Sequence, residues 1–337
     1  MKKRKKRVIL CFCIVVVLCV CVFTYNELGN KKSEKISRQI FAMDTVMDLT
    51  IYGSDGTEAM LEAIRLIQKM ERKFSVTDTK SDIFKVNSQS GNPVVVSEET
   101  YELIKDSLKY SEQTEGALDI SIYPLVKAWG FTKDKQQIPT EKERKEAMKK
   151  VDFRKIRCLD NNQIQLEKGM EIDLGAVAKG YVSQKIMELW KSKGISSGII
   201  SLGGNVQTIG KKENSSPYQV GIIDPFQTDQ LFGILSVENK AVVTSGIYQR
   251  YFTQGGKQYH HIMDSQTGMP ADHTLASVTV ISDDGTKADA LATALFVMGE
   301  EKIKKYQKNH PDIQVLYIRK DGTFWQSDQV QMTKVHN

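Results

Sequence analysis

The sequence predicts an α+β fold in a single domain, with mixed sheets and packed helices. Segments that alternate between apolar and polar residues, as half-buried strands do, are mingled with segments that carry apolar residues every three or four positions, as helices do. The two kinds follow one another in no regular order, unlike the strict alternation that builds a parallel sheet. The 337 residues contain no internal repeat and no low-complexity tract.

In the first half of the chain, residues 45–52 alternate as a strand, and apolar residues spaced along 59–74 predict a helix. Ser97, followed by two glutamates, predicts the start of a helix that ends at Gly116. The charged run at 141–150 predicts a solvated helix.

In the second half, residues 163–172 alternate as a strand and lead through Asp173 into a helix that ends at Gly194. A hairpin is predicted at 251–259, and an alanine-rich helix at 287–295. Further strands are predicted at residues 198–202, 218–223, 231–237, 241–244, 276–282 and 313–319.

The first 25 residues predict a targeting segment. Six basic residues at positions 2–7 precede sixteen uncharged residues at 8–23. As a helix this run spans roughly 24 Å, less than a bilayer core of about 30 Å. It predicts either an uncleaved signal anchor or a lipoprotein signal, although Val20 before Cys21 is a poor match to the small residue that lipidation requires. The basic flank predicts location at the cell membrane, with the domain on the extracytoplasmic side.

The rest of the chain is electrically balanced. All of the formal charge of +6 lies at positions 2–7, because residues 8–337 carry 41 basic and 41 acidic groups. A nucleic-acid-binding domain needs clustered positive charge, so we expect no nucleic-acid partner. Residues 26–38 are polar and predict a tether, which leaves a domain at 39–330.

Two patterns suggest a metal-dependent site. His260 and His261 stand beside a carboxylate and a tight turn, although an ordinary hairpin with a polar loop explains them equally well. Asp289 and Thr293 lie four residues apart, so a helix places both oxygens on one face, and hard oxygens suit Mg²⁺. The alternative for Asp289 is a charge in the first helical turn.

A third pattern suggests an anion. Lys179 lies in the first turns of its predicted helix, where a cation is unfavourable unless an anionic ligand is bound there. The alternative for Asp173 is an ordinary helix N-cap. The chain has no Gly-x-Gly-x-x-Gly, P-loop or Gly-x-Ser-x-Gly motif, so any phosphate site is of another kind.

Seven segments carry a family resemblance. They are Ala42-Met43-Asp44-Thr45, Ala117-Leu118-Asp119, residues 173–180, Leu202-Gly203-Gly204-Asn205, Thr244-Ser245-Gly246, residues 261–270 and residues 288–293. In this order they resemble the signatures of the ApbE-type FAD:protein FMN transferases, over about residues 40–325. The resemblance implies an exported Mg²⁺-dependent enzyme that transfers FMN from FAD to a threonine hydroxyl, forming a phosphoester and releasing AMP. It also implies an exported acceptor protein with a Ser-Gly-Ala-Thr-like tract, which this chain lacks.

The resemblance also assigns residues. The residues expected to bind FAD are Met43, Ala117, Leu118, Asp119, Asp173, Lys179 and the backbone near Met263. The residues expected to bind Mg²⁺ are Asp289, Thr293 and, through its carbonyl, Ala176. His261 is expected to be the general base. Gly203, Gly204 and Asn205 are expected to be scaffold around the flavin.

Two departures from the family pattern bear on how tightly FAD binds. Asp44 replaces the usual glycine, and residues 75–77 lack an expected tyrosine. Two other functions stay open: a Mg²⁺-dependent FAD pyrophosphatase, in which water replaces the acceptor, and a membrane-tethered FAD-binding protein without turnover.

Overall fold

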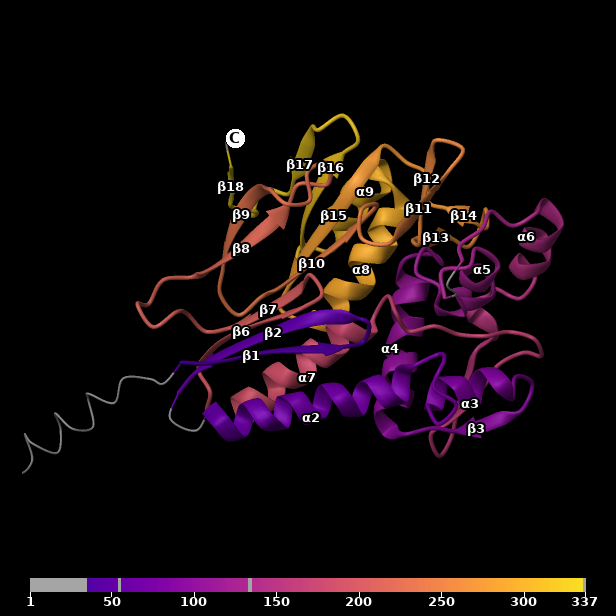
Figure 1. Cartoon of the computed structure of the whole chain (residues 1–337), viewed down its shortest axis with the longest axis horizontal. Coiled ribbons are helices and arrows are strands. Elements are labelled where there is room, and N and C mark those ends of the chain that lie inside the picture. Colours follow the sequence, from indigo (N-terminus) through magenta and orange to yellow (C-terminus); the bar gives the residue numbers. More distant parts are fainter. Residues whose placement is uncertain (1–34, 54–55, 133–134, 336–337) are drawn as a thin grey trace, which may run out of the picture.

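An eight-stranded antiparallel sheet forms the centre of the protein in the computed structural model, which describes residues 35–53, 56–132 and 135–335 (Figure 1). The strand order is β1-β2-β6-β7-β10-β15-β16-β17. These strands are β1 Lys35–Ala42, β2 Thr45–Tyr52, β6 Ser197–Leu202, β7 Asn205–Ile209, β10 Ala241–Gly246, β15 Leu275–Ser282, β16 Gln314–Arg319 and β17 Phe324–Gln326.

Helices cover one face of this sheet and a smaller sheet covers the other. The helices are α2 Gly56–Phe74 against β1 and β2, α7 Ala178–Ser192 against β7, and α8 Gly285–Met298 against β10 and β15, with α9 Glu300–Asn309 beside α8. The smaller sheet consists of β8 Tyr218–Ile223, β9 Leu231–Val237 and β18 Met332–Lys334. Neighbouring residues of β10 point to opposite faces: Val243 packs in the core with α8, and Val242 packs against the smaller sheet.

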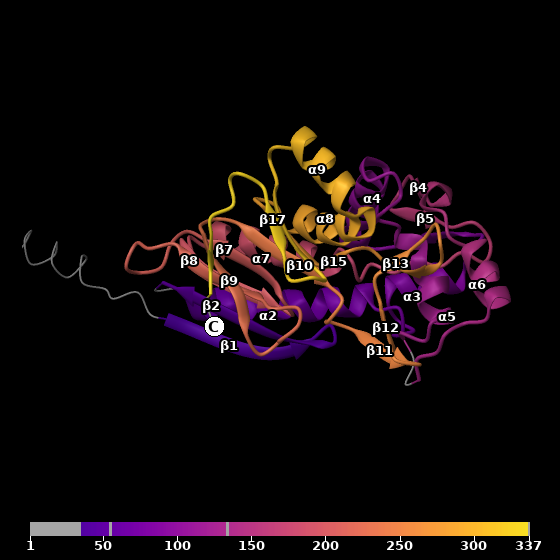
Figure 2. The same ribbon diagram turned by 90° about the horizontal axis from the view of Figure 1, so that it is seen from above.

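The remaining elements gather on one side of the molecule, at the right in both views (Figures 1 and 2). The helices among them are α3 Asp82–Ser88, α4 Glu98–Gln113, η1 Ile120–Ile122, α5 Tyr123–Ala128, α6 Glu141–Met148 and η2 Phe153–Lys155. A three-stranded sheet consists of β3 Pro93–Val95, β4 Arg157–Leu159 and β5 Gln163–Gln165. Two hairpins pair β11 Tyr251–Gln254 with β12 Lys257–His260, and β13 Met263–Asp264 with β14 Met269–Pro270. The α+β class is confirmed, and the strands predicted at 45–52, 218–223 and 231–237 have these bounds.

Several predicted boundaries are wrong. The domain predicted to end at residue 330 extends further, because β18 pairs with β9. β1 begins at Lys35, inside the segment predicted as a tether, because an edge strand needs few buried residues and every position from Lys35 to Ala42 pairs with β2. The strand predicted at 163–172 ends at Gln165. Further on, the Asn87 side chain bonds both the N–H and the C=O of Ile172, at 2.7 and 2.9 Å, in place of a neighbouring strand.

The predicted targeting segment, residues 1–25, lies outside the described residues. Within the described part of the chain, no helix combines the length and apolar composition that a membrane span requires.

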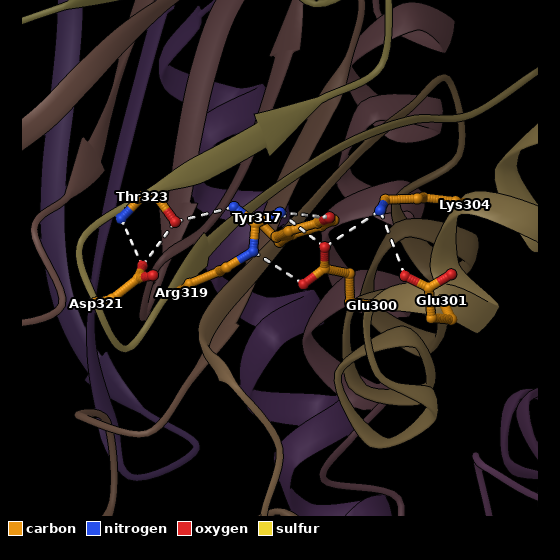
Figure 3. Close-up of polar contacts among 7 residues, drawn as sticks. All are labelled: Glu300, Glu301, Lys304, Tyr317, Arg319, Asp321 and Thr323. Atoms are coloured by element: carbon orange, nitrogen blue, oxygen red, sulfur yellow. Dashed lines mark hydrogen bonds and ion pairs between the residues drawn. The ribbon is translucent and has the colours of Figure 1, made fainter.

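A charged network joins α9 to β16, the strand next to the edge of the main sheet (Figure 3). Arg319 of β16 donates from Nε and Nη2 to the two carboxylate oxygens of Glu300, at 2.8 and 2.7 Å. Lys304 donates to the same carboxylate at 3.2 Å, and Arg319 Nη1 donates to Thr323 at 2.9 Å. These contacts fasten the start of α9 to β16.

Candidate functional site

Helices α7 and α8 cross in close contact at two glycines, Gly180 and Gly285. A Cβ on Gly180 would lie 2.2 Å from the carbonyl oxygen of Gly285 and 2.5 Å from the Cβ of Asp289. A Cβ on Gly285 would lie 2.6 Å from the hydroxyl of Ser183. Because both side chains are missing, the backbone N–H of Gly180 reaches the Asp289 carboxylate and donates to it at 2.7 Å.

Asp289 is a buried carboxylate, with 5% of its surface exposed. Burial raises its pKa, and the charge of Lys179, the Gly180 N–H and the Asn205 side chain oppose that rise. Capping does not explain the position, because Asp284 is the N-cap of α8 and accepts from Lys287 N. Asp289 lies one turn further into the helix, so it is not a first-turn charge. A bound cation would favour its ionised form.

Thr293 follows Asp289 by one helical turn and lies on the same face of α8. Its hydroxyl is 3.3 Å from the hydroxyl of Ser245 on β10. Ala176 lies in the turn just before α7 and is partly buried. These three residues come from segments that the Gly180–Asp289 contact brings together.

The residues present fit a divalent cation that prefers oxygen. A carboxylate, a hydroxyl and a main-chain carbonyl form an all-oxygen donor set of the kind that Mg²⁺ takes. Within the described residues, no three His, Cys, Asp or Glu side chains gather as a metal centre. A cation here would therefore complete its coordination with water or with ligand phosphate oxygens.

The turn from Asp173 to Lys179 precedes α7. Asp173 Oδ1 accepts from Gly175 N at 2.7 Å, and the N-cap of α7 is Val177, so Asp173 is not the cap. Burial raises the pKa of Asp173, and Arg250 and Lys179 lower it. Lys179 Nζ lies 3.4 Å from the carbonyl oxygen of Gly175, at the start of the helix.

The segment Ala117-Leu118-Asp119 lies beside this turn, since Asp173 N donates to Ile120 O at 2.8 Å. The Asp119 carboxylate caps η1: it accepts from Ser121 N at 2.8 Å and Ser121 Oγ at 2.6 Å. Its side chain is thus engaged in local structure, and the N–H groups of Ala117 and Leu118 donate to Thr114 O at 3.0 Å and to Thr114 Oγ1 at 3.2 Å.

His261 accompanies these groups from the loop after β12. Both its N–H and its Nδ1 lie within hydrogen-bonding distance of the carbonyl oxygen of Arg250, at 3.0 and 3.2 Å. A carbonyl only accepts, so Nδ1 carries the proton and Nε2 is free to accept one. Burial is the largest cause that lowers the pKa of His261, and the positive charge of Arg250 is the second. The ring is partly exposed, but both causes favour the neutral form near pH 7.

His260 has a different environment although it is the next residue. Its ring is buried, Nε2 lies 3.0 Å from Ala271 O, and the ring meets Phe296 of α8 edge to face at 5.5 Å. Burial lowers its pKa to about 4. Of the two predicted histidines, His260 packs the loop against α8, and His261 contacts the main chain of Arg250.

Met43 lies in a tight turn, and Met263 lies in a short strand. Met43 and Asp44 connect β1 to β2 with φ of 49° and 57°, and Met43 N donates to Glu71 at 2.6 Å. The left-handed conformation at Asp44 suits the glycine that the resemblance leads us to expect there, and Asp is one of the residues that tolerate it. Met263 is buried in β13.

Sequence reasoning missed Arg250 and underrated Asn205. Arg250 acts on the pKa of both Asp173 and His261, and its guanidinium is 4.0 Å from the Asp44 carboxylate. It belongs to no motif, so no sequence signal marks it. Asn205 was expected to be scaffold, yet it lies beside Asp289, and neither of its amide atoms reaches hydrogen-bonding geometry within the described part of the chain.

Comparisons with known proteins show which proteins this chain is similar to. The family model described as "ApbE family" matches residues 43–317. The FAD:protein FMN transferase of Treponema pallidum is 33% identical over 314 residues, covering 87% of each chain. The FAD:protein FMN transferase of Klebsiella pneumoniae is 33% identical over 279 residues, covering 81% of this chain and 85% of that protein. The crystal structure of the ApbE protein of Thermotoga maritima matches with a TM-score of 0.83 and 32% identity, covering 88% of this chain and 97% of that one.

Proposed function

The chain belongs to the ApbE family, and from this we propose that it transfers FMN from FAD to a threonine hydroxyl of an exported acceptor protein in a Mg²⁺-dependent reaction that releases AMP. Similar proteins bear the name FAD:protein FMN transferase. The observation that carries the proposal is that the charge of Lys179, next to the Gly180 that bonds Asp289, acts on the pKa of both Asp289 and His261, three residues from separate segments.

The reaction is a phosphoryl transfer, which depends on positioning and on neutralising negative charge. The bond from the FMN phosphorus to the bridging oxygen of the pyrophosphate breaks, and AMP leaves with that oxygen. A new bond forms between the phosphorus and the threonine Oγ. The hydroxyl proton passes to Nε2 of His261, which is unprotonated in the tautomer that the Arg250 carbonyl selects.

The other residues hold the substrate. Lys179 supplies positive charge to the pyrophosphate at the start of α7. Met43, Asp173, the segment Ala117-Leu118-Asp119 and the backbone near Met263 would hold FAD together with Lys179. Asp289, Thr293 and the carbonyl of Ala176 would hold Mg²⁺, whose chemistry when bound is Lewis-acid neutralisation of charge on the pyrophosphate.

We also propose that residues 1–25 hold the domain at the cell membrane on its extracytoplasmic side. The support is the basic run followed by an apolar run. Mass spectrometry of the mature N-terminus distinguishes a retained anchor from a diacylglyceryl group on Cys21. Recovery of the full-length protein from the soluble cytoplasmic fraction would contradict the placement.

The function is tested with the purified domain, FAD, Mg²⁺ and an acceptor that carries a Ser-Gly-Ala-Thr tract. We expect the acceptor to gain the mass of one FMN, AMP to appear in equal amount, and an acceptor with alanine in place of that threonine to stay unmodified. Free FMN beside an unmodified acceptor would instead identify a pyrophosphatase. FAD that stays intact would identify a binding protein without turnover.

A further inference from the structure

Asn205 is a buried amide with unused hydrogen-bonding capacity. It is the first residue of β7 and is 1% exposed. Neither Nδ2 nor Oδ1 has a hydrogen-bond partner in the described part of the chain. Buried polar groups are almost always paired, so an exception requires an explanation such as an ion, a water or a ligand.

Gln207 provides an internal comparison, because it lies two residues further along β7 on the same face. Its Oε1 accepts from the Ser183 hydroxyl at 2.7 Å, and its Nε2 donates to Gln184 Oε1 at 2.9 Å. Gln184 Oε1 in turn accepts from Gly285 N at 3.1 Å. The same kind of side chain on the same strand is therefore fully paired, and loose packing of β7 does not explain Asn205.

The two amides face successive turns of α8. Two residues of a strand span about 6.7 Å, and the four residues from Gly285 to Asp289 rise about 6 Å along a helix. Gln207 lies at the level of Gly285, so Asn205 lies at the level of Asp289. The level of Gln207 is fixed by its Oε1, which would lie 2.5 Å from a Cβ on Gly285.

The turn before Asn205 is rigid scaffold. Gly203 has a φ of +61°, and a Cβ there would lie 2.5 Å from Thr45 Oγ1. Asn205 pairs with Leu202 of β6 and Val243 of β10, two residues before Ser245. Both neighbouring strands thus fix its backbone, and the unpaired amide faces the group formed by Asp289, Ser245 and Thr293.

We propose that Asn205 is a positioning residue for the cation site: Nδ2 donates to the Asp289 carboxylate and Oδ1 accepts from a water bound to the cation. This inference rests on the proposed function. An amide suits the role because it both donates and accepts, whereas an aspartate would add a second negative charge beside Asp289. The role separates Asn205 from Gly203 and Gly204, which stay scaffold.

The test compares Asn205→Leu with Gln207→Leu in the same domain. Both replace a buried amide with an apolar side chain, but only Asn205 faces the cation site. Binding of Mn²⁺ in the presence of AMP, followed by the loss of the free-ion electron paramagnetic resonance signal, reports affinity without turnover. We expect Asn205→Leu to weaken Mn²⁺ binding tenfold or more, as loss of such supporting groups commonly does. We expect Gln207→Leu to keep the affinity within about twofold while its Tm falls.

The metal-free Tm adds a second readout. Replacing an unpaired buried amide with an apolar group removes an uncompensated cost, so Asn205→Leu is expected to keep or raise the metal-free Tm. Mn²⁺ affinity equal to that of the wild type would overturn the inference, whatever the Tm. If Asn205→Leu does not fold, Asn205→Ala removes the same two atoms and is measured in the same way. If the wild type did not bind Mn²⁺ any better than Asp289→Asn does, the result would count against the proposed function itself.

Discussion

Glu300 and Asp289 are both carboxylates near helix starts, but their surroundings shift their pKa values in opposite directions. Arg319 contacts both oxygens of Glu300, and Lys304 adds a third contact, so the pKa of Glu300 falls to about 2 (Figure 3). Burial raises the pKa of Asp289. A carboxylate matched by cations of its own chain serves the fold. Asp289, buried beside an unpaired amide, is the carboxylate to which we assign a ligand cation in the proposed function.

The largest expected effect comes from removing the Asp289 charge. Asp289→Asn keeps the volume but loses the anionic oxygen, so we expect transfer to fall by about a thousandfold or more. The metal-free Tm should stay or rise, because the variant removes a buried charge. The measurement is kcat/KM for acceptor flavinylation, with Tm determined on the same sample.

The matched control for this variant is Asp283→Asn. Asp283 precedes α8, its side chain is largely exposed, and it pairs with Lys240 at 2.5 Å. Exposed pairs contribute little, so we expect wild-type activity and a nearly unchanged Tm. If Asp289→Asn kept more than a tenth of the transfer activity, Asp289 would not differ from the control Asp283 in its importance for the reaction.

The next effect concerns His261. His261→Gln removes the proton acceptor, and we expect about a hundredfold loss of transfer. Because the pKa of His261 lies below its usual 6.5, the wild-type rate should hold as pH falls through 6.5 and decline only at lower pH, where the imidazole gains a proton. A pH profile of kcat/KM checks this. His260→Gln should leave the acid limb where it is, and an unchanged limb in His261→Gln would contradict the assignment.

A smaller effect on activity, with a larger one on stability, is expected for Gly180→Ala. The new Cβ would meet the main chain of Gly285 and the Cβ of Asp289, so the helices must separate. We expect a loss of about 2 kcal/mol in the free energy of unfolding and a tenfold or greater loss of transfer. Gly194→Ala at the end of the same helix has open space but a φ of +75°, so it should cost about 1 kcal/mol and leave activity intact. Equal effects on activity would contradict the role of the crossing.

The sequence predicts features that depend on local periodicity. The strands at 218–223 and 231–237 follow from alternation, because one face of each is buried. The placement of Asp289 and Thr293 on one face follows from helical geometry alone. The seven ordered segments led to the family, which the comparisons show.

Other features depend on which segments meet in space, and the sequence could not predict them. The backbone of Ile172 is satisfied by the side chain of Asn87, 85 positions earlier, so an alternating run did not become a long strand. Arg250 matters because the fold carries it to Asp173 and His261. Gln207 finds partners on α7 whereas Asn205 finds none in the described part of the chain, and no local sequence pattern encodes that difference.

The smallest effect is expected on the structural side of the comparison. Glu300→Gln keeps the shape but weakens the paired contacts with Arg319, so we expect a loss of about 1 kcal/mol at pH 7 and unchanged transfer activity. The pKa of Glu300 is lowered, so its stabilisation is complete above about 4.5 and is lost as pH falls toward 2. Denaturant unfolding at several pH values should therefore show the gap between wild type and variant closing over that range. Glu301→Gln, whose exposed carboxylate meets only the end of Lys304 at 3.5 Å in the drawn network, serves as the control and should change neither quantity. If Glu300→Gln instead reduced transfer while leaving stability intact, Glu300 would act in function and not in the fold. Ion pairing within the chain would then not distinguish Glu300 from Asp289.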